Sequence, residues 1–195
     1  MKSTSLLLIV VPCLFLIGCP AYSVYPLYTD QDAVVEPALE GTWYDPESHD
    51  KGGITFQKSG DHEYTMASLD PDSKISQSYN VHLVRLGDQL FMDLIFENQT
   101  LNGEALSAPM GVVPTHVITK VKISGEDFAF ATLEGDAIKK QNAAGGARLD
   151  YQISEAGLLV TSQPDALRRY IFAHAEDAFP DSGHLKRKAK APAKP

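Results

Sequence analysis

Six histidines are the residues of this chain that would most readily bind a metal ion: His49, His62, His82, His116, His174 and His184. Imidazole ligands on one helix or strand commonly recur at i, i+4 or i, i+2, and zinc proteases carry a His-Glu-x-x-His run. None of these histidines is spaced in that way. We therefore predict no metal site, and leave open an incidental cross-strand pair of His82 and His116, because both fall on the predicted polar faces of strands.

Patterns for nucleophilic or acid–base catalysis are also missing. No Gly-x-Ser-x-Gly elbow, Ser-x-x-Lys pair or phosphate-binding glycine-rich loop occurs in a credible context. Asp70-Pro71-Asp72 lacks the alternating oxygens and closing glutamate of a calcium loop, which favours a turn. Asp93 and Glu97 could serve acid–base chemistry, but carboxylates at this density are usually solvated. We predict no catalytic residue, no cofactor and a non-enzymatic role, with a hydrolase as the least favoured alternative.

Both cysteines, Cys13 and Cys19, lie in an N-terminal segment with the features of a signal peptide. A positive start at Lys2 precedes an apolar run over 6–17, which is too short to cross a ~30 Å hydrocarbon core that needs ~20 helical residues. The run closes with Leu16-Ile17-Gly18-Cys19. This order of an apolar residue, a small residue and a cysteine resembles the lipobox of bacterial lipoproteins. The alternatives are an ordinary secretory signal with a chance cysteine and an uncleaved membrane helix.

The lipobox resemblance implies that the peptide is cut between Gly18 and Cys19, that the Cys19 thiol receives a diacylglycerol, and that the new amine is often acylated. Such chains are a durable membrane anchor, because each buried CH₂ contributes about 0.8 kcal/mol. Pro20 follows the cysteine in place of aspartate, so the resemblance favours a periplasm-facing protein of the outer membrane over the inner one. No cysteine would remain in the folded domain, which excludes a disulfide and thiol catalysis there.

The composition fits one acidic globular domain. The chain has 195 residues, of which 44% are hydrophobic and 22% charged. A net charge of −8 argues against a broad nucleic-acid-binding surface. We predict a signal peptide over 1–18, the lipidated cysteine and an extended tether over 19–39, a β-rich domain over 40–180, and a basic tail over 181–195. The tail is expected either to be disordered and solubilising or to contact anionic headgroups.

Alternating apolar and polar residues predict antiparallel strands in the domain. Over 75–86 the odd positions are mostly apolar, Gly87-Asp88 then forms a turn, and a second strand follows over 89–96. Short strands of this kind recur between turn dipeptides, which indicates a mainly β fold: an antiparallel meander that forms a barrel or half-barrel. The connection over 99–114 is the candidate lid of a pocket. Apolar residues at helical spacing over 163–179 predict a C-terminal amphipathic helix that packs on the sheet.

Gly41-Thr42-Trp43, at the start of the first strand of the predicted domain, resembles the Gly-x-Trp signature of lipocalin and calycin barrels. The resemblance implies that Trp43 closes one end of a barrel that holds a small apolar ligand. Arg148 is the candidate for the arginine that such barrels place on a late strand. A tryptophan that simply fills the core is the alternative. The residues expected to line the interior, as ligand contacts or as core, are Trp43, Phe56, Tyr64, Tyr79, Leu83, Met92, Leu94, Phe128 and Phe130.

The chain also resembles a group of uncharacterised bacterial lipoproteins in which the lipobox precedes a Pro-Leu-Tyr segment, here Pro26-Leu27-Tyr28, and a Leu-x-Gly-x-Trp entry, here over 39–43. That resemblance implies a β-rich fold but no particular activity. Two functions remain open. The barrel holds a small apolar ligand, or a filled barrel acts as a scaffold that binds other envelope components. The sequence names neither the ligand nor the partner, and leaves the oligomeric state undetermined.

Overall fold

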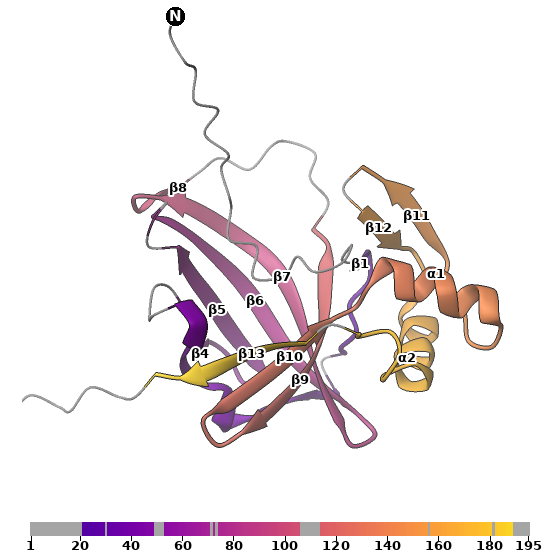
Figure 1. Ribbon diagram of the computed structural model, residues 1–195, viewed down its shortest axis with the longest axis horizontal. Coiled ribbons are helices and arrows are strands. Elements are labelled where there is room, and N and C mark those ends of the chain that lie inside the picture. The colour runs from indigo at the N-terminus through magenta and orange to yellow at the C-terminus, as the bar shows by residue number, and fades with distance from the viewer. Residues whose placement is uncertain are drawn as a thin grey trace, which may run out of the picture.

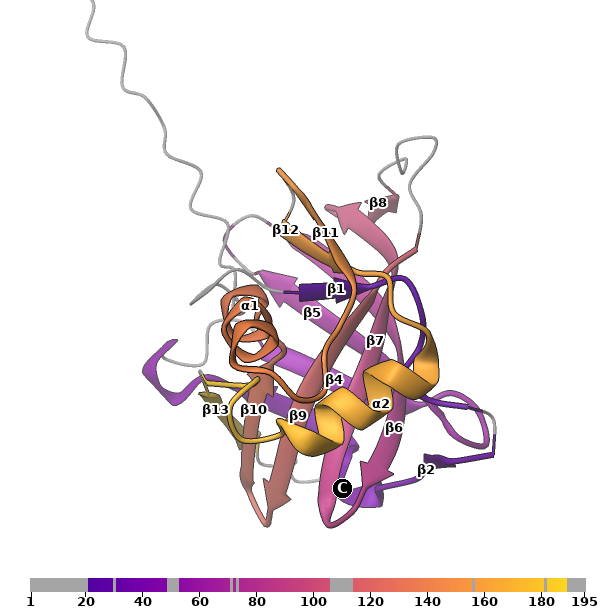
Figure 2. The same cartoon turned by 90° about the vertical axis from the view of Figure 1, so that its right-hand side faces the viewer.

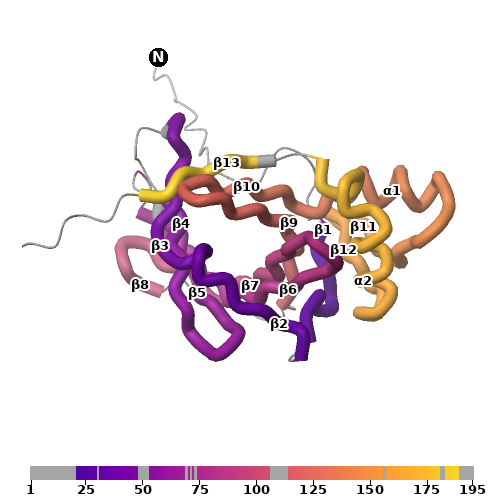
Figure 3. The backbone as a smooth tube through the Cα atoms, turned by 90° about the horizontal axis from the view of Figure 1, so that it is seen from below, coloured from indigo at the N-terminus to yellow at the C-terminus, as the bar shows by residue number. Residues whose placement is uncertain are grey.

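Eight strands close into an antiparallel barrel in the computed structural model, which describes residues 21–29, 31–48, 53–70, 72, 74–105, 114–155, 157–180 and 182–188 (Figure 1). Each strand pairs with the next, and β7 pairs with β9 to complete the ring (Figure 3). The sequence prediction of an antiparallel meander barrel with a C-terminal helix is therefore confirmed, in its closed form. The eight strands are β3 (Gly41–Tyr44), β4 (Gly53–Lys58), β5 (Glu63–Asp70), β6 (Ile75–Leu86), β7 (Gln89–Leu101), β9 (His116–Ser124), β10 (Asp127–Thr132) and β13 (Ser182–Arg187).

The strand that closes the ring is β13, which comes from the segment predicted as a basic tail. It pairs with β10 on one side and with β3 on the other. The prediction of a tail outside the domain is wrong for residues 182–187, which form a strand of the barrel. Polar and basic residues there flank one side chain that points into the barrel. Leu185 is buried in the barrel, while Lys186 is exposed and lies 2.5 Å from the carboxylate of Asp127. Residues 189–195 of the predicted tail lie outside the described residues.

The chain between β10 and β13 folds against one side of the barrel (Figures 1 and 2). It contains α1 (Gly135–Ala144), the hairpin of β11 (Tyr151–Ser154) and β12 (Gly157–Val160), and α2 (Pro164–Ala173). Proline fits the first turn of α2 because that turn needs no backbone donor. This helix is shorter than the predicted 163–179. It ends where His174 leaves helical geometry, and hydrogen-bonded turns continue the chain to Ala178.

The segment predicted as a tether, residues 19–39, is part of the fold wherever it is described, so this prediction is corrected. β1 (Ala21–Ser23) pairs with β9 at the point where β10 ends, and also with β12. β2 (Ala33–Val34) pairs with β6 just beyond the end of β5. The short helix η1 (Pro37–Leu39) then leads into β3, and η2 (Pro46–Ser48) follows β3. Between β1 and β2 the described chain crosses the outside of the barrel, and we call residues 24–29 and 31–32 the strap.

The predicted lid segment, residues 99–114, contains the end of a hairpin in its first part. β7 continues to Leu101 and pairs with β8 (Glu104–Ala105). Asn102 and Gly103 both have positive φ at the turn, which is the backbone that a tight type I′ hairpin requires. This Asn-Gly pair is the sequence signal that the loop prediction overlooked. Residues 106–113 of the segment lie outside the described residues.

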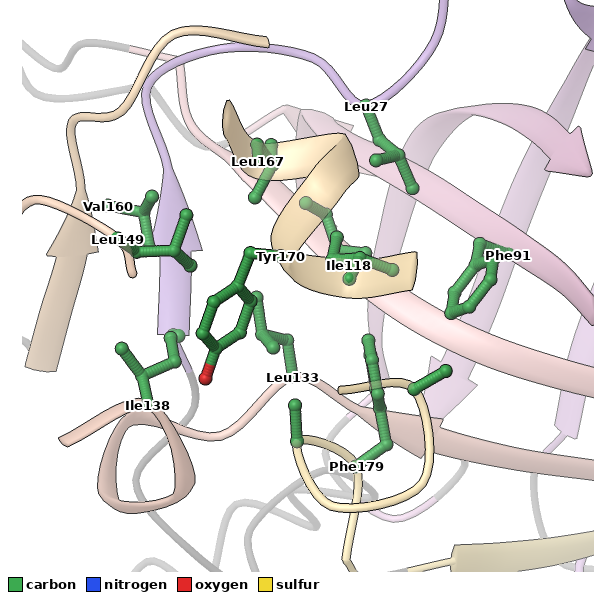
Figure 4. Packing of buried hydrophobic residues seen from close by; sticks show 14 of the residues in the cluster. Leu27, Phe91, Ile118, Leu133, Ile138, Leu149, Val160, Leu167, Tyr170 and Phe179 are labelled. Atoms are coloured by element: carbon green, nitrogen blue, oxygen red, sulfur yellow. The ribbon is translucent and has the colours of Figure 1, made fainter. Parts of the chain in front are cut away.

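Two hydrophobic cores hold these layers together. One fills the barrel, and its members alternate with outward residues along each strand. The other lies between the outer face of β7 and β9 and the added layer of α1, α2 and β12 (Figure 4). Tyr170 of α2 points into this second core, where its ring extends between Ile138 and Leu133. The barrel wall is thus covered by apolar side chains on both faces along this side.

Candidate functional site

The barrel interior is lined by large side chains that contact one another. The ring centre of Phe128 lies 5.3 Å from that of Trp43, 5.8 Å from that of Phe56 and 5.8 Å from that of Phe130. These separations are typical of packed aromatic pairs. A side chain that faced a ligand-sized void would expose surface to it, yet Trp43, Phe56 and Phe128 are each at most 2% exposed. The described part of the interior is therefore filled by the protein's own residues.

The predicted lining residues all belong to this interior cluster or touch it. Trp43, Phe56, Tyr64, Leu83, Met92, Leu94, Phe128 and Phe130 are buried members, and Tyr79 packs against them while partly exposed. The structure thus brings the nine predicted residues into one cluster. Their arrangement is that of core side chains, and the pocket anticipated beside residues 99–114 falls partly outside the described residues.

Trp43 is fixed at the end of the barrel by an arginine on the closing strand. Arg187 of β13 lies 4.1 Å above the Trp43 ring, and its guanidinium donates to the carbonyls of Glu40 (2.5 Å) and Ala38. The indole N–H donates to the carbonyl of Leu39 at 2.8 Å. The partner of Trp43 is therefore Arg187, and the prediction of Arg148 is wrong. Arg148 is an exposed residue between α1 and β11.

Gly41, the first residue of the Gly-x-Trp entry, makes room for that arginine. Its φ is +123°, a backbone angle that residues other than glycine rarely adopt. A Cβ at this position would lie 2.8 Å from a guanidinium nitrogen of Arg187. The motif thus has a physical reason in this chain. Glycine permits the close approach, tryptophan supplies the aromatic face, and Arg187 links η1 to β13.

At the other end of the barrel, β6 and β7 extend beyond the filled core and expose apolar groups. Phe96 shares the inward parity of Met92 and Leu94, but it is 43% exposed and contacts the ring of Tyr79 with centres 5.6 Å apart. Leu101, at the end of β7, is 39% exposed. A register shift at Ser78/Tyr79 accompanies this change from closed barrel to extended hairpin. We call Tyr79, Phe96 and Leu101 the mouth residues.

A buried acid–imidazole pair lies on the outer face of the barrel beneath the strap. The Asp93 carboxylate of β7 is 2.6 Å from Nδ1 of His116 on β9, and its second oxygen accepts the backbone N–H of Leu27 at 2.6 Å. Asp93 is completely buried, so these contacts offset the loss of water around its charge. Arg168 of α2 completes the arrangement by donating to the Leu27 carbonyl at 2.7 Å and pairing with Asp32 at 2.6 Å.

The strap partly covers the outer faces of β6 and β9, which the sequence predicts to be polar and exposed to solvent. His82 and His116 both lie on the outer face as expected, but Tyr28 of the strap stacks on the His82 ring with centres 3.8 Å apart. Asp93 is in register with His82 and bonded to His116, so the acid between the two histidines is the residue that sequence reasoning did not connect to them. Glu97 lies elsewhere and accepts from Ser78 at 2.8 Å.

Ser23 is in register with His116 on neighbouring strands, which places a hydroxyl on the same sheet face as the acid–imidazole pair. That hydroxyl donates to the Tyr25 carbonyl at 2.7 Å and accepts the Tyr25 N–H at 3.2 Å. Both hydrogen bonds of the Ser23 hydroxyl thus hold the backbone at the point where the chain leaves β1. The group therefore fastens the strap, as do Asp93 and Arg168. Among the described residues, no set of three or more His, Cys, Asp or Glu side chains is arranged to hold a metal ion.

A small pocket of about 180 Å³ lies beside α2, at the turn between β6 and β7. Its lining includes the ring of Phe172, which is 67% exposed, and the polar residues Asp88 and Gln89. This volume is below the roughly 300 Å³ from which small-molecule sites usually begin. The pocket is thus too small for the apolar ligand anticipated from the sequence.

The strand pairing and the Trp43–Arg187 closure define a class of protein: a closed eight-stranded antiparallel β-barrel with a helical layer on one side. Comparison with protein-family models, with curated proteins and with solved structures finds no match to this chain. Within the described residues neither helix has the length and apolar character needed to cross a bilayer.

Proposed function

We propose that this protein is a non-enzymatic interaction module of the bacterial cell envelope, anchored to the membrane through acyl chains on Cys19. The single observation that carries the choice of an interaction module is the filled barrel. Phe128 lies within 5.8 Å, centre to centre, of three other aromatic rings of the interior, and it is only 2% exposed. A barrel occupied in this way can act through its outer surface and its ends.

The anchor and the location rest on the lipobox at Leu16-Ile17-Gly18-Cys19 and on Pro20, which favour the periplasmic side of the outer membrane. Substitution of Cys19→Ala tests this part. We expect an unprocessed precursor without lipid, whereas the parent chain should yield a mature N-terminal peptide that carries diacylglycerol. Ordinary processing of the variant would contradict the anchor.

Binding of a small apolar ligand is the second candidate, and the mouth residues favour it. Phe96 and Leu101 are exposed although they are large and apolar, and Phe96 continues the inward face of β7 above the core. An apolar molecule seated there would cover them without displacing the packed interior.

Native mass spectrometry of residues 20–195, purified gently from the host, separates the two candidates. The interaction module predicts the mass of the bare polypeptide. A stoichiometric apolar molecule would instead support the second candidate. In that case, Phe96→Ser should abolish co-purification, and Phe172→Ser should retain it because Phe172 is equally apolar but lies by the distant β6–β7 turn.

A further inference from the structure

The lipid anchor and the fold are separated by almost no spacer. Ala21 is already in β1, where it is buried and bonded through its N–H to the Leu133 carbonyl at 2.9 Å. Two residues span at most about 7 Å even when fully extended. If Cys19 carries the acyl chains, the surface around Ala21 therefore lies at the level of the lipid headgroups. A protein on a long tether could turn freely, but this one cannot.

The strands around Ala21 identify the surface that is brought to the bilayer. Ala21 pairs with Leu158 of β12, and Leu158 pairs with Ile153 of β11, so these three residues form one row across neighbouring strands. Ile153 is at the outer end of that row and is 67% exposed. Ala21 and Leu158 are buried in the second core, so Ile153 is the member of this row that can enter the apolar region beside the acyl chains.

The mouth residues lie at the same end of the molecule. In both Figure 1 and Figure 2, β8 and the β11–β12 hairpin project from one end, opposite the turn between β6 and β7. Leu101 is paired with Glu104 of β8, and Phe96 precedes it on β7. Of the four large apolar side chains exposed in the described residues, three are therefore at this end. The fourth, Phe172, contacts the opposite end, because its ring lies against Gly87 of the β6–β7 turn.

We infer that the protein sits on the bilayer with the end that carries β8 and the β11–β12 hairpin against the lipid, so that Ile153 and the mouth residues face the lipid. The inference rests on the proposed lipidation of Cys19 and adds an orientation to it. The lipid surface is the occupant because the anchor holds it within two residues of β1 and because three exposed large apolar side chains, Phe96, Leu101 and Ile153, lie at this end of the molecule. The Trp43 end of the barrel, the β6–β7 turn and α2 then face away from the membrane, toward partners.

Single-cysteine labelling of the full lipidated protein tests this orientation. The only two cysteines are Cys13 and Cys19, so after cleavage and acylation an introduced thiol would be unique. Ile153→Cys and Phe172→Cys form a matched pair, since both side chains are 67% exposed, and Leu101→Cys reports on the mouth. Each variant is labelled with an environment-sensitive fluorophore and reconstituted in phosphatidylethanolamine–phosphatidylglycerol vesicles with or without nitroxide-labelled lipid.

We expect the nitroxide lipid to quench the label at position 153 at least twofold more than the label at 172, with position 101 behaving like 153. Equal quenching at 153 and 172 would overturn the orientation. Shielding of position 153 from an aqueous quencher without quenching by lipid would also overturn it, because a second copy or another protein would then cover the row.

Two readouts on the same samples separate this inference from the anchor itself. The mass of the N-terminal peptide and flotation with the vesicles report on lipidation alone. A lipidated protein that floats but shows equal quenching contradicts only the orientation. A peptide without diacylglycerol, from protein that does not float, contradicts the anchor and the orientation together.

Discussion

The guanidinium of Arg187 lies 4.1 Å above the ring of Trp43, and this contact joins the last strand of the barrel to the first. Arg187 also donates to two carbonyls of the η1 region. A planar guanidinium can stack on the ring and bond at its edge at the same time, whereas an ammonium cannot.

Arg187→Lys should therefore loosen the barrel although the charge is kept. We expect a loss of about 1–3 kcal/mol in the free energy of unfolding, from the carbonyl bonds and the ring contact. Denaturant unfolding followed by Trp43 emission measures it, since Trp43 is the single tryptophan. Lys188→Ala is the control, because Lys188 is exposed and should change stability by no more than about 0.5 kcal/mol. Equal stability of Arg187→Lys and the parent would refute the role of the guanidinium.

Gly183 should be required for closure by β13. It faces Phe130 across the β10–β13 pair, and a Cβ at this position would overlap the Phe130 ring. Gly183→Ala should cost about 1–3 kcal/mol of stability through overpacking. The cost should fall when the ring is removed by Phe130→Leu, so a double-mutant cycle should show coupling between the two positions. Additive effects would mean that the ring moves aside freely.

Asp93→Ala should release the strap. The change leaves His116 and the Leu27 N–H without their buried acceptor, and each buried polar group left unsatisfied typically costs about 1–3 kcal/mol. Hydrogen exchange at the Leu27 amide should accelerate more than exchange in β4. Asp136→Ala is the control, because Asp136 is 74% exposed and pairs only at the surface with Lys139. Unchanged exchange at Leu27 would contradict the proposed fastening.

Tyr170 should make the protein less stable at alkaline pH. Burial, with a smaller effect from Asp177, raises the pKa of Tyr170 from 10.0 to about 12, and its buried hydroxyl has no hydrogen-bond partner among the described residues. The folded state thus keeps a proton that the unfolded state loses between pH 10 and 12. Stability from this group is complete below pH 10 and declines as the pH rises to 12, by up to about 2–3 kcal/mol.

Tyr170→Phe removes that titration. Its free energy of unfolding should match or exceed that of the parent at pH 7, and its advantage should grow above pH 10. Urea unfolding of both proteins at pH 7 and pH 11 measures the difference. A constant difference between the two pH values would contradict the assignment to Tyr170.

Local pattern determined the strands and their inward faces. Alternation places Val81 and Leu83 on one face of β6 whatever strand lies beside it, because side chains of an extended chain point alternately to opposite sides. The interior residues, the β6–β7 hairpin and the position of α2 could be predicted for this reason. The ends of the helices and strands were predicted less exactly. The end of α2, for example, depends on the turns that place Phe179 in the second core.

Only the tertiary structure decided which distant segments complete the barrel and its strap. Residues 182–187 carry one inward residue, Leu185, among cations, and this pattern becomes a strand when β10 and β3 offer open edges on both sides. Asp93 becomes a buried anchor because the strap crosses above it and brings the Leu27 N–H to its carboxylate. The sequence alone determined the strands and the Gly-x-Trp entry, whereas Arg187, β13 and the strap were decided by non-local pairing, whose free energy exists only once both partners are in place.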